Sequence, residues 1–438
     1  MRTQRLWRAA GAIAAVGGLA TAAGCTSGGP ASSPAAGHST GQPSSGTPST
    51  SAGPGASGSS APSPEASAAA SAQAVQGPAA VPTAAQLAAL RAQAGEIARL
   101  SPEQLAGQRV IYSYNGLTPP AGLLKLIRAG DVGGVIFFSF NIASQAQLQS
   151  VVSQLVAANA ASSNPARQYP LLLMTDQEGG EVRRLPWAGP SESEAQIGAA
   201  GNPAAAAATA GAQAAAGLRS VGINVNLAPV LDVYRAAGDF DDQFQRSYSM
   251  NPSVVGAAGA AFVGAQQAGN VASTVKHFPG LGAATATQNT DNVPVTINLP
   301  LSTLRAVDES PYAAAFQAGA KLAMVSWAQY PALAPGLPAA LSPAIVQGEL
   351  EGRLGFSGVT ITDALGAGAL ASYGSLENKT MLAGRAGMDA LLCTATKPLP
   401  GLKCVDGLEN GYLDGALPQT AFQAQLAQLL QLRASLPT

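Results

Sequence analysis

Two aspartates and a lysine–histidine pair in this chain have the types and positions needed for acid–base or nucleophilic chemistry. His277 follows Lys276, and the only other histidine, His38, lies in a Ser/Gly/Pro-rich segment, so a mechanism that needs an imidazole depends on His277. Asp176 and Asp363 each follow an aliphatic or β-branched run, which predicts that each ends a strand. Carboxyl and imidazole groups serve as general acids, bases or nucleophiles. We therefore expect these four residues to share one site.

The elements that must position these residues are eight short apolar runs, separated by stretches long enough for a helix. Such strands alternating with helices indicate a parallel sheet of the α/β class, and eight units fit a single (β/α)8 TIM-type barrel. A doubly wound open sheet is the alternative, but no G-x-G-x-x-G motif follows the first run, so nothing supports dinucleotide binding. The predicted strands are 110–113, 134–138, 171–174, 223–227, 272–275, 322–325, 359–361 and 390–392.

Residues at the ends of these strands should converge on one rim, because the chemistry of such barrels takes place on the loops after the strand C-termini. A single aspartate there can simply cap a helix or brace a loop. Several aspartates together with a Lys–His pair favour a functional site instead. The residues that we place on the rim are Asp176, Asp232, Lys276, His277, Trp327 and Asp363.

The charge balance argues against a nucleic-acid partner. The chain has 23 Lys and Arg against 24 Asp and Glu, a net charge of −1, with no basic block after its N-terminus. A nucleic-acid-binding protein needs clustered positive charge to displace counterions. Nothing in the sequence indicates a partner chain, and we expect a monomer.

The N-terminus predicts export and a lipid anchor. Residues 1–24 combine three arginines with a short apolar segment, as in a signal peptide. The tetrapeptide 22–25 resembles a bacterial lipobox, which predicts cleavage before Cys25 and lipidation of its thiol; an ordinary secretory signal is the alternative. Residues 25–82 are rich in Ser, Gly, Pro and Ala and predict a disordered tether. It would hold the barrel domain, residues 83–438, outside the cytoplasm on the outer face of the cell membrane.

Two further cysteines bracket a loop with two prolines and a glycine near the C-terminus. In an oxidising compartment, Cys393 and Cys404 are expected to form a disulfide. Metal ligation is the alternative, but two thiols and one distant histidine make a poor ligand set.

Five motifs resemble those of family 3 glycoside hydrolases, most closely the single-domain β-N-acetylhexosaminidase branch. They occur in the family's order, and the likeness extends from about residue 100 to the C-terminus. The motifs are 176–180 with Arg184, 222–233, 246–249, 276–280 and 355–363.

The resemblance implies a role for each matching residue. Asp363 is the expected nucleophile, which would form a covalent glycosyl-enzyme and retain the configuration of the sugar. The resemblance implies no metal or organic cofactor, and the expected partner is a carbohydrate. The residues expected to bind the terminal sugar are Asp176, Arg184, Arg246, Lys276 and His277.

The chain departs from that branch at the acid/base. Relatives carry a histidine on the loop after Lys-His-Phe-Pro-Gly, but Asn289 occupies that position here, and an amide cannot donate a proton at neutral pH. Asp291 is the nearest titratable group on the same loop and is our candidate acid/base. Glu178 or Asp242 are the alternatives, and a third is that the protein binds sugar without cleaving it.

The function implied by the resemblance is a retaining glycoside hydrolase that releases terminal β-linked sugars from cell-wall or other glycans. N-acetylglucosamine is the first expectation, with β-glucosides and β-xylosides as alternatives. A catalytically silent sugar-binding lipoprotein on the same barrel is the second hypothesis.

Overall fold

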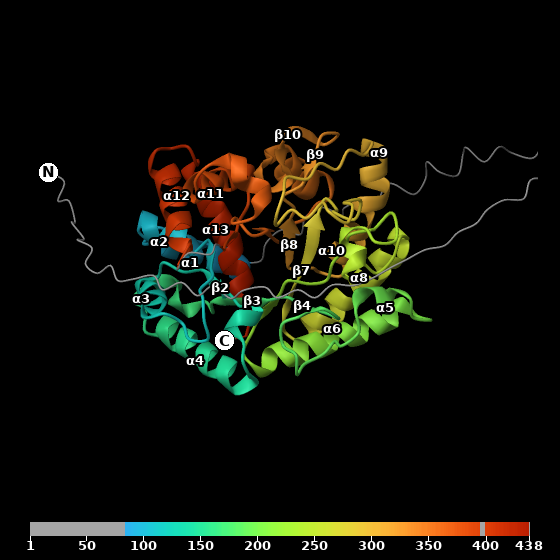
Figure 1. The fold of residues 1–438 in the computed structure, drawn as a ribbon. Helices are drawn as coiled ribbons and strands as arrows, with labels where there is room; N and C mark the ends of the chain where they lie inside the picture. Colours follow the sequence, from blue (N-terminus) through green and yellow to red (C-terminus); the bar gives the residue numbers. More distant parts are fainter. Residues whose placement is uncertain (1–83, 395–398, 438) are drawn as a thin grey trace, which may run out of the picture. The chain divides into compact units, whose positions relative to one another are not determined.

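Eight parallel strands close into the barrel that the apolar runs predict (Figure 1). The structure is a computed structural model that describes residues 84–394 and 399–437. The predicted signal peptide, the predicted lipidation site Cys25 and the predicted tether of residues 25–82 lie outside the described residues. Within the described ranges, no helix has the length and apolar character needed to cross a membrane.

All eight strand predictions are confirmed, and the strands pair in one cycle. The order is β11-β8-β7-β6-β3-β2-β1-β12, and parallel bonds between Thr362 N and Ala390 O (3.1 Å) and between Ala390 N and Thr360 O (2.9 Å) close the ring. The strands are β1 (Val110–Tyr112), β2 (Gly134–Ile136), β3 (Leu172–Thr175), β6 (Val225–Asn226), β7 (Ala272–Phe278), β8 (Leu322–Val325), β11 (Val359–Thr362) and β12 (Leu391–Cys393).

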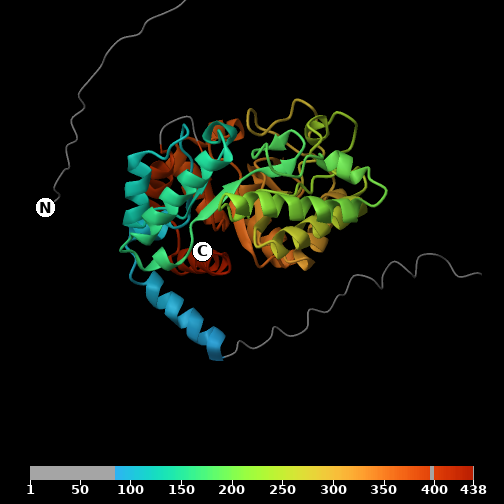
Figure 2. The same ribbon diagram turned by 90° about the horizontal axis from the view of Figure 1, so that it is seen from below.

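Helices connect successive strands and surround the ring, as Figures 1 and 2 show from two directions. Two connecting segments, η4 (Leu304–Asp308) and η6 (Ala344–Arg353), have π-helical hydrogen bonding, which no sequence pattern predicted. The other connecting helices are α3 (Ala121–Ala129), α4 (Gln145–Ala160), α6 (Pro203–Ser220), α8 (Pro252–Ala268), α10 (Ser310–Gln317) and α11 (Leu376–Ala386); α12 (Gly401–Leu413) and α13 (Gln419–Ala434) follow β12.

Side chains alternate along the strands between the barrel interior and the helix layer. Ile111, Met174 and Ile361 belong to an interior apolar cluster, against which Leu429 and Leu432 of α13 also pack. A second and larger apolar cluster fills the space between the strands and the surrounding helices. Because α13 contacts the interior cluster, the last helix helps to fill the barrel core.

Short elements outside the ring shape the rim and the approach to the barrel. The N-terminal helices are α1 (Ala84–Ile97) and α2 (Pro102–Gly107); Ser101 and Gln104 form a capping box at the start of α2. Two antiparallel hairpins, β4 (Gln177–Gly179) with β5 (Val182–Arg183) and β9 (Gln329–Tyr330) with β10 (Ala334–Pro338), were not predicted.

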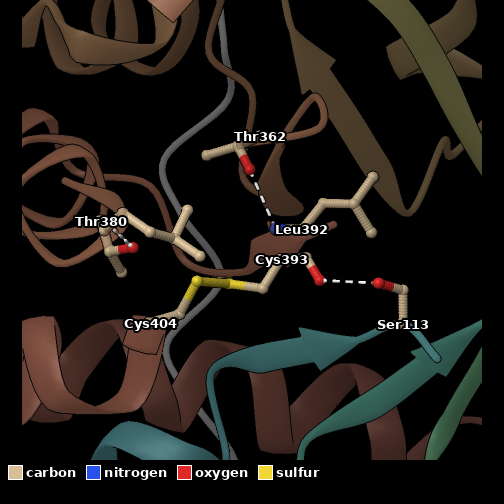
Figure 3. Close-up of a disulfide and its surroundings, with 7 residues drawn as sticks. Ser113, Thr362, Thr380, Leu392, Cys393 and Cys404 are labelled. Atoms are coloured by element: carbon tan, nitrogen blue, oxygen red, sulfur yellow. Dashed lines mark hydrogen bonds between the residues drawn. A yellow bond between two sulfur atoms is a disulfide. The ribbon is translucent and has the colours of Figure 1, made fainter. Parts of the chain in front are cut away.

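A disulfide joins Cys393 at the end of β12 to Cys404 in α12 (Figure 3). Both cysteines are fully buried. The carbonyl oxygen of Cys393 also accepts a hydrogen bond from Ser113 Oγ (3.1 Å), and the amide of Leu392 donates to Thr362 Oγ1 (2.9 Å). The end of β12 is therefore fixed to its neighbours on both sides.

Candidate active site

One cavity at the C-terminal ends of the strands brings together the candidate nucleophile, the first-choice acid/base and all of the sugar-binding candidates. Its volume is about 190 Å³, below the usual range for sites that enclose drug-sized ligands. A cavity of this size suits one terminal sugar residue rather than a long glycan. The candidates that line it are Asp176, Arg184, Arg246, Lys276, His277, Asp291 and Asp363.

Asp363 follows β11 directly and faces this cavity. Its Oδ1 accepts a hydrogen bond from the amide of Ala364 (2.6 Å), and its own amide donates to the carbonyl of Val325 in β8 (3.4 Å). The side chain is half-buried. The strand end and the following turn thus fix the direction of this carboxylate.

Glu178 contacts two of the cations that line the cavity. Its carboxylate bonds to Arg246 through Nε (2.8 Å) and Nη2 (2.9 Å), and Lys276 Nζ lies 2.7 Å from Oε1. Burial alone would raise the pKa of Glu178, but the two cations outweigh it and hold the pKa far below its ordinary value. Asn226 of β6 fixes the neighbouring main chain by two hydrogen bonds with Gln177 (2.9 and 3.0 Å).

Lys276 lies within β7, which extends three residues beyond its predicted end. Its ammonium group is almost fully buried and also contacts Asp176 Oδ1 at 2.8 Å. Burial alone would lower the pKa of Lys276, but Asp176 and Glu178 outweigh it and raise the pKa. The lysine therefore stays charged and holds Asp176 at the cavity wall, where the carboxylate can accept hydrogen bonds from sugar hydroxyls.

His277 lines the cavity and is held by Asp232, which does not line it. Its Nδ1 lies 2.7 Å from Asp232 Oδ2, while Asp232 Oδ1 accepts bonds from the amides of His277 (3.3 Å) and Leu281 (2.5 Å). Burial alone would lower the pKa of His277, but the Asp232 carboxylate outweighs it and the pKa is raised. The peptide bond between Lys276 and His277 is cis.

Asp241 completes a buried cluster with Asp232 and His277 whose polar atoms lie within 4.8 Å of one another. Such a group is the nearest approach to a metal site among the described residues. Asp232 and His277 already bond to each other, however, and Asp241 Oδ1 lies 3.3 Å from Arg246. We therefore assign the cluster to positioning His277 and Arg246 and not to holding a metal.

Arg184 differs from the other cations of the cavity because it makes no ion pair within the described part of the chain. It follows strand β5 and its main-chain amide donates to the carbonyl of Asp176 (3.2 Å). Its buried Nε has no hydrogen-bond partner there. A buried donor without a partner is costly, and a bound sugar oxygen would satisfy it.

Asp291 reaches the same cavity from the loop after β7. Its amide donates to Asn289 Oδ1 (2.8 Å), and its carbonyl oxygen accepts from the amide of Gly368 (2.7 Å). The residue is exposed on the loop, yet it lines the cavity. Desolvation and then the Asp363 carboxylate raise the pKa of Asp291. A carboxyl group with a raised pKa can hold the proton that a general acid must donate.

Comparison with known proteins identifies the family. The sequence matches the model of the glycosyl hydrolase family 3 N-terminal domain over residues 103–432. The chain belongs to glycoside hydrolase family 3. It is 46% identical over 333 residues to an uncharacterized secreted glycosyl hydrolase of Arthroderma benhamiae, covering 75% of this chain and 93% of that protein.

Two solved structures resemble this family 3 fold. One is a glycoside hydrolase family 3 β-N-acetylglucosaminidase from a Paenibacillus species, with TM-score 0.71, 32% identity, and coverage of 77% of this chain and 63% of that one. The other is a β-N-acetylhexosaminidase from Beutenbergia cavernae, with TM-score 0.67, 32% identity, and coverage of 77% and 99%. The predicted fold, family and glycoside hydrolase class are confirmed.

The geometry of this family 3 chain argues against the alternative acids. Glu178 is fully enclosed between Arg246 and Lys276, which stabilise its ionised form, so it cannot donate a proton at neutral pH. Asp242 accepts a hydrogen bond from the amide of Gly238 (2.7 Å) and does not line the cavity. Trp327, placed on the rim by its sequence position, is buried beneath it, and its Nε1 donates to the carbonyl of Ala364 (2.9 Å).

Sequence reasoning did not predict which cation or imidazole each supporting carboxylate of this family 3 site contacts. Asp232 was placed on the rim without a partner, and Asp241 was not singled out. Phe138 was assigned only to the predicted strand 134–138; β2 ends at Ile136, and the Phe138 side chain lines the cavity instead. An aromatic residue at a strand end was the available signal for Phe138.

Proposed function

We propose that this family 3 glycoside hydrolase is an exo-acting, retaining β-N-acetylhexosaminidase with Asp363 as nucleophile and Asp291 as acid/base. The observation that carries the proposal is that both carboxyl groups line one small cavity, together with the sugar-binding candidates. Retaining enzymes need one carboxylate for attack and a second carboxyl group for proton transfer.

The proposed reaction has two steps at the anomeric carbon. Asp291 donates its proton to the glycosidic oxygen as the bond from that oxygen to C1 breaks, and the Asp363 carboxylate forms an ester bond to C1. The leaving group departs as an alcohol. Asp291, now ionised, removes a proton from water, whose oxygen attacks C1 and displaces Asp363. The released sugar keeps its β configuration.

The remaining residues of the cavity hold the terminal sugar. Asp176 offers a carboxylate as acceptor. Hydrogen-bond donors come from Arg184, Arg246, Lys276 and His277. Since Glu178 and Asp232 hold most of these donors in place, little side-chain motion is needed on binding. N-acetylglucosamine is the proposed sugar, because the similar Paenibacillus enzyme is a β-N-acetylglucosaminidase.

We place the enzyme outside the cytoplasm, attached to the membrane through a lipid on Cys25. The buried disulfide between Cys393 and Cys404 supports an oxidising compartment, and the Arthroderma relative is described as secreted. Labelling with a radioactive or alkyne-bearing fatty acid should mark the wild-type lipoprotein and leave Cys25→Ala unlabelled.

A panel of 4-nitrophenyl β-glycosides tests the proposed activity. Wild-type enzyme should release nitrophenol fastest from the N-acetylglucosaminide. The kcat of Asp363→Asn should be lower than that of wild type by at least about a thousandfold, because the covalent intermediate cannot form. The control Asp242→Asn removes a carboxylate outside the cavity and should keep wild-type rates. If wild-type enzyme gives neither turnover nor a glycosyl-enzyme mass adduct on any glycoside, the protein binds sugar without cleaving it.

A further inference from the structure

A second hollow adjoins the catalytic cavity on the side of Asp291. Its volume is about 360 Å³, and Phe138, Asp291 and Ala364 line both spaces. We call it the leaving-group hollow and define it by Ser113, Asn115, Phe138, Phe140, Asp291 and Thr394. These residues follow β1, β2, β7 and β12, so the hollow belongs to the same rim as the candidate nucleophile.

Two aromatic rings form one wall of this hollow. The rings of Phe138 and Phe140 stack with centroids 5.4 Å apart and planes inclined by 26°. Phe138 is half-buried between the two spaces, whereas Phe140 is 53% exposed. An exposed aromatic ring beside a catalytic cavity is a common sign of a contact surface for a ligand.

The turn that carries these rings is held rigidly. Phe138 precedes the 3-10 turn η2 (Ser139–Asn141), and Phe140 lies within it. The side chain of Asn141, the last residue of this turn, is fully buried. Asn141 Nδ2 donates to the carbonyls of Tyr114 and Gly116 (2.9 Å each), and its Oδ1 accepts from the amide of Phe138 (2.9 Å). The aromatic wall is thereby fixed to the loop after β1 and is formed before any ligand binds.

The strand ends of β1 and β12 that contribute to the hollow are also fixed. Ser113 donates to the carbonyl of Cys393, and the disulfide to Cys404 anchors the residue that precedes Thr394 (Figure 3). Residues held by hydrogen bonds or by the disulfide therefore line the hollow, and Asp291 lines both it and the catalytic cavity.

We propose that the leaving-group hollow binds the pyranose ring on the leaving-group side of the bond that is cleaved, with its apolar C–H face on Phe140. This proposal rests on the proposed function. The oxygen that Asp291 protonates joins the two sugars, so the second sugar must lie beside Asp291, away from the cations of the catalytic cavity. The hollow satisfies this condition, and an aromatic ring offers C–H contacts to a pyranose face. The enzyme should thus favour β-linked oligosaccharides over glycosides with small leaving groups.

A pair of substrates with alkoxide-type leaving groups tests this assignment. N,N′-diacetylchitobiose places a second pyranose in the hollow, whereas methyl β-N-acetylglucosaminide does not, and both need a proton from the acid. Phe140→Ala should lower kcat/KM for the disaccharide roughly 3- to 10-fold, mainly through KM, because it loses one stacking contact. It should change kcat/KM for the methyl glycoside less than about twofold.

Further variants separate the ring from bulk and from folding. Phe140→Tyr keeps the ring and should keep wild-type KM, while Phe140→Leu keeps apolar bulk and should show the loss. Trp187→Ala is the matched control, because Trp187 is 37% exposed and lines a separate hollow with no residue in common with either space. Its KM values should equal those of wild type.

The outcomes distinguish the two proposals. Equal losses on both substrates in Phe140→Ala, or an unchanged KM for the disaccharide, would overturn the leaving-group assignment and leave the glycosidase intact. A loss confined to 4-nitrophenyl glycosides would indicate an aryl-binding site and overturn it as well. If the wild-type enzyme cleaves none of these compounds, the proposed function is wrong, and this inference fails with it.

Discussion

The carbonyl oxygen of Asp291 accepts a hydrogen bond from the amide of Gly368, with an N···O distance of 2.7 Å. A second bond, from the amide of Ala369 to the carbonyl of Thr290 (3.0 Å), lies beside it. The segment that follows Asp363 therefore holds the loop that carries the candidate acid/base. The two carboxyl groups proposed for catalysis are positioned relative to each other by main-chain contacts, which do not depend on side-chain identity.

Removal of the Asp291 carboxyl should affect the two chemical steps differently. Asp291→Ala is expected to lower kcat/KM about 10²- to 10⁴-fold for the disaccharide, the usual contribution of a general acid. The kcat/KM of the same variant for 2,4-dinitrophenyl glycosides should fall much less, because that leaving group needs no proton. Sodium azide should then speed turnover and yield a β-glycosyl azide, because azide attacks the glycosyl-enzyme without a general base. Steady-state kinetics and product NMR measure both effects.

The control for this experiment is Asp242→Ala, which removes a carboxyl group from the same rim but not from the cavity. It should show neither selective loss nor azide rescue. If Asp291→Ala lowers kcat/KM equally for natural and activated substrates, Asp291 is not the acid/base.

The close approach at Gly368 makes a second prediction. A Cβ added there would lie 2.2 Å from the carbonyl oxygen of Asn292, a separation that real Cβ atoms do not adopt, so the loop with Asp291 must move. Gly368→Ala should lower kcat/KM for the disaccharide by roughly 10- to 100-fold and spare activated aryl glycosides. Gly264→Ala in α8, where no atom lies within 4 Å of the added Cβ, is the matched control. A Gly368→Ala enzyme with wild-type selectivity would show that the loop adapts.

The pattern of apolar runs explains why the fold could be predicted from the sequence. Buried parallel strands are continuous apolar runs, and each of the eight runs proved to be a strand of the ring. The exact ends were less predictable. β7 continues through Lys276 and His277 because their side chains face buried carboxylates, which a hydropathy pattern treats as a break.

The site was predictable as a set of residues but not as a network. Strand ends indicated which side chains meet on the rim. They could not show that Glu178, 68 residues from Arg246, is the central anion, or that Asp232 serves His277. Such pairings depend on the three-dimensional positions of loops, and several carboxylates of equal chemical type compete for each cation. Phe140 escaped notice because a single aromatic residue in a short turn has no periodic pattern.

Arg184, which makes no ion pair within residues 84–394 and 399–437, should contribute a large share of the binding energy of the sugar. Its buried Nε lacks a partner among the described residues, so a sugar oxygen would gain a charge-assisted hydrogen bond there. Arg184→Met should raise KM about 10- to 100-fold, in line with hydrogen bonds of charged groups, and change kcat less. Arg183→Met is the control, because Arg183 lines a separate hollow. An unchanged KM for Arg184→Met would mean that this group does not contact the sugar.

The buried carboxyl group of Asp241 predicts a pH-dependent stability. Burial and then the neighbouring Asp232 raise the pKa of Asp241 to about 7 from its ordinary 3.8. Between these two pH values the folded chain holds a proton that the unfolded chain has lost, so the contribution of Asp241 to the free energy of unfolding falls as pH rises, by up to about 1.4 kcal/mol per pH unit. Asp241→Asn cannot titrate, and its stability relative to wild type should therefore increase from pH 4.5 to 7.5 in urea denaturation. Ser247→Ala removes a buried bond to the Asp232 carbonyl without removing a titrating group, and its difference from wild type should stay constant. A constant difference for Asp241→Asn as well would show that Asp241 is already ionised at pH 4.5.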